Sequence, residues 1–387
     1  MEILVEKSNA VRLEALPPLA LYVHIPWCVR KCPYCDFNSH ERTGALPEAG
    51  YVEKLLRDLE SLLPSVWGRR LSSLFIGGGT PSLFAPESID ALLSGVRARL
   101  PVEPGAEITL EANPGTVEAA RFRGFREAGV NRISVGVQSF DDAMLRALGR
   151  IHGAGEARRA VDAALAAFDN VNLDLMYGLP GQSLAMARAD IEAGVATGVP
   201  HLSAYQLTIE PNTVFFSKPP RLPEHDLCAD MQAMIEEVLG ENRFEHYETS
   251  AFARPGHRCR HNLNYWQFGD YLGIGAGAHG KISFPDRITR HEWAKQPASY
   301  MKEASVQHRE IEPRELPFEF MLNALRLPYG FSSSLFEERT GLPFTAISRP
   351  LQAAEEKGLI ERDLKQVRPT LKGQRFLNEL LQLFLAA

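Results

Sequence analysis

The feature that most constrains the fold is a regular alternation of apolar, β-rich runs with segments of helical periodicity. The β-rich runs occupy residues 19–25, 71–76, 107–110, 132–137, 171–176 and 202–208. The segments with helical spacing of apolar residues occupy 51–63, 86–100, 117–128, 155–168 and 184–196. Strands that alternate with helices in this way form βα units around a parallel sheet, which predicts an α/β fold.

Polar or glycine-rich residues stand at or near the carboxyl end of each β-rich run. They are three cysteines at the first run and then Gly77–Gly79 with Thr80, Glu111, Gln138, Asp174, and the pair Gln206 and Glu210. In a (β/α) barrel, the functional site lies at this end of the strands. Six units rather than eight predict a partial, laterally open (β/α)6 barrel. A Rossmann sheet is the competing architecture, but the first βα turn carries cysteines where a G-x-G-x-x-G sequence is expected.

The first strand end carries three cysteines in eight residues, Cys28, Cys32 and Cys35. Three thiolates can hold three irons of a [4Fe–4S] cube and leave the fourth iron open for a small molecule, whereas a fully ligated cluster normally takes four cysteines. The alternative is a structural zinc site, which needs a fourth Cys or His ligand nearby, and His40 could serve.

Composition and charge narrow the class of protein. Of the 387 residues, 45% are apolar and 23% are charged, an ordinary globular composition, and the length suits one large domain with a smaller one. The net charge of −6 and the pI near 6.0 argue against a nucleic-acid-binding surface. Five cysteines, three of them clustered, suit a reducing compartment rather than a disulfide framework. Since we find neither a signal-peptide pattern nor an apolar stretch of about 20 residues, we expect a soluble, cytoplasmic protein.

The cysteine spacing and the strand-end sequences together resemble the radical S-adenosylmethionine (SAM) superfamily, and within it the coproporphyrinogen III oxidase-like branch. The stretches that carry the resemblance are 22–26, 28–40, 77–83, 111–114, 136–140, 148–152, 174–182, 205–213, 261–266 and 273–279. The resemblance implies that SAM chelates the open iron through its amino and carboxylate groups. It also implies that reductive cleavage of SAM can give a 5′-deoxyadenosyl radical, chemistry that the cofactor carries and the protein positions.

Several rim residues match positions that contact SAM in the family. They are Tyr22, Tyr34, Gly78, Gly79, Thr80, Glu111, Gln138, Arg150 and Asp174. Glycines let the backbone approach a ligand closely, and an arginine can hold a carboxylate with two hydrogen bonds. A lone glycine run is more often a tight turn, and a lone strand-end Asp is often a helix cap. Their coincidence on successive strand ends favours the functional interpretation.

Two features relate this chain to a group of heme chaperones within that branch. The oxidase has a further cysteine two residues after the third, where this chain has Phe37. This chain also carries His261-Asn262-Leu263-Asn264-Tyr265-Trp266, an H-N-x-x-Y-W motif that the resemblance associates with heme. His261 is then the candidate axial ligand, with Cys259 as a second candidate, while Tyr265 and Trp266 could pack on the macrocycle. Taken alone, a histidine beside aromatic residues is more often structural.

The chain divides into four predicted parts. They are an N-terminal extension (1–18), the partial barrel (19–215), a barrel extension with the H-N-x-x-Y-W motif (216–314) and an α-rich, winged-helix-like module (315–387). We expect helices at 222–239, with Cys228 in its core face, and at 317–327, 334–340, 345–357 and 371–385, with a hairpin at 358–369. Winged helices usually bind DNA, but the last part has equal numbers of basic and acidic residues, so we expect a lid or a partner-docking surface.

Two functions follow from the resemblance. The first is a chaperone that binds heme, holds a [4Fe–4S] cluster and SAM, and delivers heme to an apo-acceptor, which implies an electron donor and, through the acceptor, peripheral membrane association. The alternative is an oxygen-independent coproporphyrinogen III oxidase. Phe37 and the motif at His261 favour the chaperone, and we assign no catalytic residue. An enzyme acting on RNA is a weaker third hypothesis, because the net charge is negative.

Overall fold

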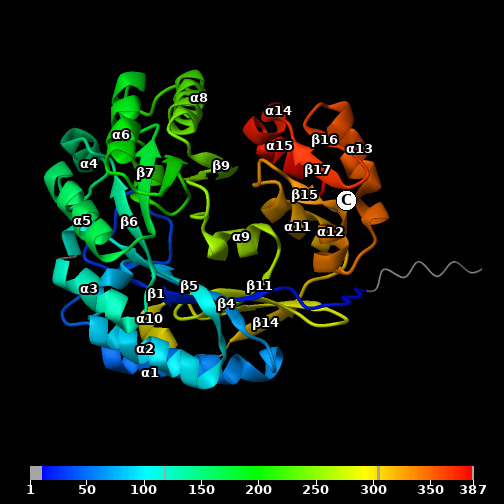
Figure 1. The fold of residues 1–387 in the computed structure, drawn as a ribbon, viewed down its shortest axis with the longest axis horizontal. Helices are drawn as coiled ribbons and strands as arrows, with labels where there is room; N and C mark the ends of the chain where they lie inside the picture. The colour runs from blue at the N-terminus through cyan, green and yellow to red at the C-terminus, as the bar shows by residue number, and fades with distance from the viewer. Residues whose placement is uncertain (1–10, 117–118, 303–305, 386–387) are drawn as a thin grey trace, which may run out of the picture.

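The computed structural model describes residues 11–116, 119–302 and 306–385, and it contains one large curved sheet (Figure 1). The sheet has 12 strands in the order β14-β13-β12-β11-β1-β4-β5-β6-β7-β8-β10-β9. Its central parallel strands are β1 (Leu19–Ile25), β4 (Leu71–Gly78), β5 (Val102–Ala112), β6 (Arg132–Gln138), β7 (Val171–Tyr177) and β8 (His201–Gln206). The predicted six-stranded partial barrel is therefore confirmed. The predicted N-terminal extension lies partly outside the described residues, as do residues 117 and 118 of the third expected helix.

Helices cover the outer face of these parallel strands (Figure 1). They are α1 (Glu48–Leu62), α2 (Pro86–Arg99), α3 (Ala119–Ala128), α5 (Ala154–Ala167) and α6 (Leu184–Ala196), close to the ranges expected from periodicity. A short helix that we did not predict, α4 (Asp142–Ala147), follows β6. Asp141 begins it, because its carboxylate accepts hydrogen bonds from the backbone N–H groups of Ala143 and Met144.

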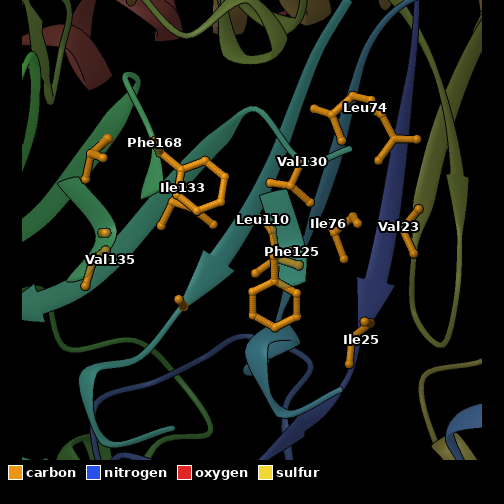
Figure 2. Packing of buried hydrophobic residues seen from close by; sticks show 14 of the residues in the cluster. Val23, Ile25, Leu74, Ile76, Leu110, Phe125, Val130, Ile133, Val135 and Phe168 are labelled. Atoms are coloured by element: carbon orange, nitrogen blue, oxygen red, sulfur yellow. The ribbon is translucent and has the colours of Figure 1, made fainter. Parts of the chain in front are cut away.

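The main hydrophobic core lies between the sheet and these helices. Val23, Ile76 and Leu110 come from three neighbouring strands and belong to the same buried cluster as Phe125 of α3 (Figure 2). Full burial of one such side chain contributes about 1.5–3 kcal/mol to folding. This core holds the parallel strands in register, so that their polar carboxyl ends meet at one edge of the barrel.

The barrel extension adds strands to both edges of the parallel sheet. β11 (Asp270–Ile274) pairs in parallel with β1, and β12 (His279–Ser283), β13 (Ile288–Glu292) and β14 (Gln307–Glu310) continue antiparallel from it. At the other edge, β10 (Ala251–Ala253) pairs antiparallel with β8 and with β9 (Glu245–Glu248). The remaining helices of this part are α7 (Val214–Ser217), α8 (His225–Glu241), α9 (Arg260–Trp266) and α10 (Pro297–Lys302). We did not predict these edge strands.

Helix α9 carries the H-N-x-x-Y-W sequence and lies in the middle of the molecule (Figure 1). It contacts β1, β4 and β11. The Glu107 carboxylate of β5 accepts hydrogen bonds from the backbone N–H groups of Arg260 and His261, at 3.0 Å each, which satisfies the free donors at the start of the helix. Buried Cys228 lies on α8, as expected.

The C-terminal module combines short helices with a three-stranded sheet. Its elements are α11 (Leu316–Ala324), β15 (Phe331–Ser332), α12 (Ser333–Thr340), α13 (Ser348–Glu356), β16 (Ile360–Arg362), β17 (Gln366–Pro369), α14 (Leu371–Arg375) and α15 (Leu377–Gln382). The single helix expected at 371–385 is instead two helices, because Phe376 leaves the helical conformation with φ −110° and ψ 42°. Phe268 and Ile288 of the extension share one buried cluster with Phe320 of α11, so the module packs on the barrel extension. The boundary at residue 315 stays a prediction.

Candidate functional site

A cavity of about 360 Å³ lies at the carboxyl ends of the parallel strands. All three clustered cysteines line it, and so do eight of the nine residues expected to contact SAM: Tyr34, Gly78, Gly79, Thr80, Glu111, Gln138, Arg150 and Asp174. The ninth, Tyr22, lines a neighbouring cavity. We call the first one the cysteine cavity. The binding of SAM in this cavity stays a prediction, but the residues predicted from separate strand ends do line the same cavity.

The cysteines lie on a loop that two very short strands close at its base. β2 (Trp27–Cys28) pairs in parallel with β3 (His40–Glu41). The three thiols are half-buried and free of disulfides. The Arg150 guanidinium lies 3.7 Å from the sulfur of Cys32. Burial is the largest cause of the raised pKa of Cys28 and of Cys35.

The zinc alternative needs a fourth ligand beside the three cysteines. Among the described residues, no three His, Cys, Asp or Glu side chains form a group that could hold one metal ion. His40, the fourth zinc ligand that we considered, does not line the cysteine cavity, and its Nε2 is 3.1 Å from Oδ1 of Asn38. A cube presents separate irons to its three ligands, so its cysteines need not converge on one point.

The glycines after β4 are required by packing as well as by the cavity. Gly78 has φ +118°, and a Cβ atom there would lie 2.6 Å from the His24 ring. At Gly79 a Cβ atom would lie 2.6 Å from the carbonyl oxygen of Trp27. Both distances are shorter than van der Waals contact, so β4 can approach the end of β1 only without side chains at these positions. The sequence predicts that these glycines allow close approach of a ligand, and the structure shows that they also allow β4 to pack against the end of β1.

Two buried carboxylates face the cysteine cavity. Burial is the main cause that raises the pKa of Glu111 to about 8, and the nearby Asp174 raises it further. A hydrogen bond of 3.0 Å from the backbone N–H of Gly78 acts in the opposite direction and lowers the pKa. Burial also raises the pKa of Asp174, although the Ser134 hydroxyl (2.8 Å) and the Asn172 amide (2.9 Å) donate to it. A cationic ligand between these groups would favour their ionised forms, which gives the cavity a preference for positive charge.

Arg150 and Asn113 also line the cysteine cavity. Arg150 donates from Nη2 to Oδ1 of Asn113 (2.6 Å) and to the carbonyl of Gly136 (2.8 Å), while its buried Nε has no partner among the described residues. The Asn113 amide donates to the Thr80 hydroxyl at 2.9 Å. We did not predict Asn113 as a site residue, although its place two residues after Glu111 on the same strand end was a usable signal.

Gln138 ends β6 with a left-handed backbone. Its φ is +69°, next to an irregularity in the pairing of β6 with β7. For a residue other than glycine this conformation costs about 1–3 kcal/mol and is concentrated at functional sites. The irregular strand end places Gln138 on the wall of the cysteine cavity.

A second, larger cavity of about 730 Å³ shares part of its wall with the first. Asp36, Phe37, Gly78 and Glu111 line both cavities. We call the second one the aromatic cavity, because Tyr22, Phe37, Tyr265, Trp266, Phe268 and Tyr271 line it. Sequence analysis did not predict it, because its walls come from the barrel, the extension and, through Asn323, the C-terminal module.

The structure separates the members of the H-N-x-x-Y-W motif. Tyr265 and Trp266 line the aromatic cavity, but His261 is buried behind them. Its Nδ1 lies 3.1 Å from the Ser73 hydroxyl and its Nε2 lies 2.9 Å from the Tyr265 hydroxyl. Burial lowers the pKa of His261 to about 3, so the ring is neutral. Both of its nitrogens are therefore engaged within the protein.

Cys259, the second candidate heme ligand, is also buried. Its thiol lies 3.4 Å from Oε1 of Glu107 and lines neither cavity. Burial raises the pKa of this thiol to about 12. The neutral thiol is a poor metal ligand, because metals bind the thiolate.

Comparison with known proteins identifies two families along the chain. Residues 22–193 match the radical SAM superfamily, and residues 311–376 match the HemN C-terminal domain. The chain is 50% identical over 374 residues to the heme chaperone HemW of Escherichia coli K12, which covers 96% of this chain and 99% of that protein. It is 48% identical over 377 residues to HemW of Haemophilus influenzae, covering 96% and 98% of the two chains.

A solved structure shares the fold over nearly the whole chain. Coproporphyrinogen III oxidase (HemN) from Escherichia coli, described as a radical SAM enzyme, superposes with a TM-score of 0.80. The match covers 95% of this chain and 90% of the oxidase, at 22% sequence identity. At this level of identity the similarity concerns the fold alone.

Proposed function

The chain belongs to the HemW family of the radical SAM superfamily, and we propose that it is a chaperone that binds heme and delivers it to apo-proteins. The observation that carries the proposal is the aromatic cavity of about 730 Å³, which adjoins the cysteine cavity. Sites for small molecules and cofactors are commonly about 300–1,000 Å³ and are lined by apolar and aromatic side chains with a few polar groups. A porphyrin fits this description.

The cysteine cavity would hold the cluster and SAM that the radical SAM family implies. We propose that Cys28, Cys32 and Cys35 ligate a [4Fe–4S] cluster, which when bound supplies an electron to SAM. Glu111 and Asp174 would orient SAM as acceptors, and both compensate positive charge. Tyr34, Gly78, Gly79, Thr80, Gln138 and Arg150 would complete the binding surface, and Tyr22 would support it from the adjoining wall.

An oxidase has the same fold, so the oxidase function is the alternative. Phe37 favours the chaperone function over that alternative. Phe37 stands where the oxidase is expected to carry a further cysteine, and it lies on the wall shared by the two cavities. Its side chain is 61% exposed. An exposed phenyl ring at this place can pack on a flat apolar ligand but cannot ligate metal or transfer protons.

Partners follow from the same proposal. Delivery of heme requires an apo-acceptor, and reduction of the cluster requires an electron donor. None of the helices in the described part of the chain is long and apolar enough to cross a membrane. We propose a cytoplasmic protein that meets a membrane only through its acceptor and that has no nucleic-acid partner.

Truncation of either cavity carboxylate should weaken SAM binding. We expect Asp174→Ala or Glu111→Ala to reduce the binding free energy by about 1–3 kcal/mol, the usual cost of leaving polar groups unpaired. Calorimetry on cluster-loaded protein measures this. Asp169→Ala, a nearly fully exposed carboxylate outside both cavities, is the matched control and should bind SAM like the wild type. If cluster-loaded wild type does not bind SAM at all, the assignment of the cysteine cavity is wrong.

SAM binding should also depend on pH with a defined sign. The pKa of Glu111 is raised to about 8, so below that value the carboxyl is mostly protonated before SAM binds. A ligand that prefers the carboxylate must displace this proton. SAM affinity should therefore increase from pH 6.5 to about pH 8 and then level off. At pH 7, binding of SAM should release a proton from the Glu111 carboxyl to the buffer. Glu111→Gln should flatten this dependence, and an unchanged pH profile in that variant would contradict the prediction.

One anaerobic experiment tests the proposed function. Reconstituted wild-type protein is incubated with heme and, separately, with coproporphyrinogen III and SAM. We expect a bound-heme spectrum, transfer of heme to an apo-protein added later, and no substantial decarboxylation. SAM-dependent conversion of coproporphyrinogen III, without heme binding, would instead support the oxidase.

A further inference from the structure

We propose that the aromatic cavity holds heme with His279 as an axial ligand of the iron and with Lys31 and Lys295 paired with its propionates. This inference rests on the proposed function, and it differs from our expectation from the sequence, which assigned the axial position to His261. Heme needs a flat apolar surface, cations near its two carboxylates and an accessible metal ligand.

The apolar surface comes from rings on three separate parts of the chain. Tyr265 of α9 packs edge-on against Tyr271 of β11 with their ring centroids 4.4 Å apart, and Trp266 follows Tyr265 along the same wall. Phe37 projects from the cysteine loop with most of its side chain exposed. Burial of this exposed ring against a macrocycle would recover apolar surface that is otherwise in contact with water.

The cavity wall has more basic than acidic groups. Its lysine and arginine residues are Lys31, Lys281, Arg290 and Lys295, whereas its acidic residues are Asp36 and Glu111. Glu111 is mostly uncharged at neutral pH, because its pKa is raised to about 8. An anionic ligand would therefore depend on those cations of the wall that are not already neutralised by a buried carboxylate.

The two exposed lysines are the cations available to such a ligand. Lys281 is buried in an ion pair with Asp270, and Arg290 is paired with Glu319. Lys295 is 67% exposed, and its ion pair with Glu292 is a long, solvent-exposed one of 3.6 Å, which a propionate can replace. Exposed Lys31 donates to the backbone carbonyl of Phe37 at 3.1 Å, which holds its ammonium group near the cavity without neutralising it.

His279 is an exposed histidine on the wall of the aromatic cavity. Its side chain is 52% exposed at the start of β12, and its Nε2 lies 3.6 Å from Oε1 of Glu292. Histidines that ligate metals usually have one ring nitrogen directed at a carboxylate, which orients the ring and leaves the second nitrogen for the metal. Burial lowers the pKa of His279, although the nearby Glu292 acts to raise it.

The other histidines near the cavity lack a comparable nitrogen. His24 lines the same cavity, but its Nδ1 lies 2.9 Å from the Tyr22 hydroxyl and its Nε2 lies 2.9 Å from the carbonyl oxygen of Asn38. His261 is engaged at both nitrogens by Ser73 and Tyr265. His261 is then a positioning residue, which holds the Tyr265 hydroxyl and so fixes the ring that faces the cavity.

The axial ligand is tested by titrating the full-length, cluster-loaded protein with ferric heme. His279→Ala should weaken heme binding by about tenfold or more and change the Soret band, and added imidazole should restore the wild-type spectrum. His225→Ala, an exposed histidine on α8 outside both cavities, is the matched control and should behave like the wild type. His261→Ala should lower affinity but keep the axial-ligand spectrum, because the ligand itself remains.

The propionate contacts are tested with heme dimethyl ester, which has the same macrocycle without carboxylates. Wild type should prefer heme to the ester. Lys31→Ala and Lys295→Ala should each weaken heme binding about two- to fivefold and leave binding of the ester unchanged. The control is Lys357→Ala, an exposed lysine outside the cavity. The iron–sulfur absorption and SAM binding report whether each variant is folded.

The outcomes separate this inference from the proposed function. If wild type binds heme but His279→Ala keeps its affinity and spectrum, or if imidazole rescues His261→Ala instead, the assignment of His279 is overturned and the chaperone function stands. Equal binding of heme and its ester by wild type overturns the lysine contacts. If folded, cluster-loaded wild type binds no heme, the proposed function itself fails.

Discussion

Replacing any one of Cys28, Cys32 and Cys35 with alanine should abolish the broad iron–sulfur absorption of the reconstituted protein. These three thiols line one cavity at the carboxyl ends of the parallel strands. Three thiolates hold three irons of a cube, so the loss of one leaves two irons without protein ligands. SAM binding should be lost with the cluster, because the open iron is part of the proposed SAM site.

Iron and sulfide analysis and anaerobic absorption spectra measure this effect. Cys228→Ala is the matched control, because Cys228 is buried on α8 and lines neither cavity. It should retain the full cluster content. Two results would contradict the prediction: full iron and sulfide content in the triple alanine variant, or stoichiometric zinc in wild-type protein purified without oxygen.

Asp270→Asn should destabilise the fold by about 3–5 kcal/mol, the cost of leaving a buried charge without its partner. The Asp270 carboxylate is fully buried at the start of β11, where it accepts hydrogen bonds from Arg69 and Lys281 at 2.8 Å each. The Ser283 hydroxyl and backbone N–H also donate to it, at 2.7 and 3.0 Å. Without the carboxylate, the ammonium group of buried Lys281 would have no compensating charge, so chemical denaturation should show a large loss of stability.

The effect of this carboxylate should disappear in acid. Burial acts to raise the pKa of Asp270, but Lys281 and Arg69 outweigh it and hold the pKa below the ordinary value. A depressed pKa stabilises the fold above the unfolded-state pKa of about 3.9, and this contribution is lost as the pH falls through the folded-state value. The difference between wild type and Asp270→Asn should be complete at pH 7 and shrink below about pH 4. Asp169→Asn, which changes the exposed ion pair with Arg126, should have no measurable effect.

The parallel barrel could be predicted because its signal is local. Each strand and helix shows its own periodicity, and parallel strands necessarily present their carboxyl ends at the same edge. This rule predicts that the cysteines lie near Glu111, Gln138 and Asp174, and all of these residues line one cavity. It did not reveal that Gly78 and Gly79 are also required for packing against His24 and Trp27, because that contact depends on the distance between β4 and β1.

The aromatic cavity could not be predicted, because its walls are distant in the sequence. Phe37, Tyr265, Lys295 and Asn323 meet only once β11 has paired with β1 and the C-terminal module has packed on the extension. Neither the pairing of β11 with β1 nor the packing of the module can be predicted from a short segment of the sequence. The motif at His261 is an example. Its spacing can be read from the sequence, but the sequence does not indicate that Tyr265 and Trp266 line the cavity while His261 is buried.

The sequence by itself therefore determined the parallel half of the sheet, the cysteine loop and the rim of the cysteine cavity, since strand periodicity and strand ends are local properties of the chain. Only the tertiary structure decided which histidine faces open space. Helix α9 places His261 against Ser73 and Tyr265 and buries it, whereas β12 leaves His279 exposed at the cavity. The physical reason is that burial depends on what packs against a side chain, and those neighbours come from strands far away in the sequence.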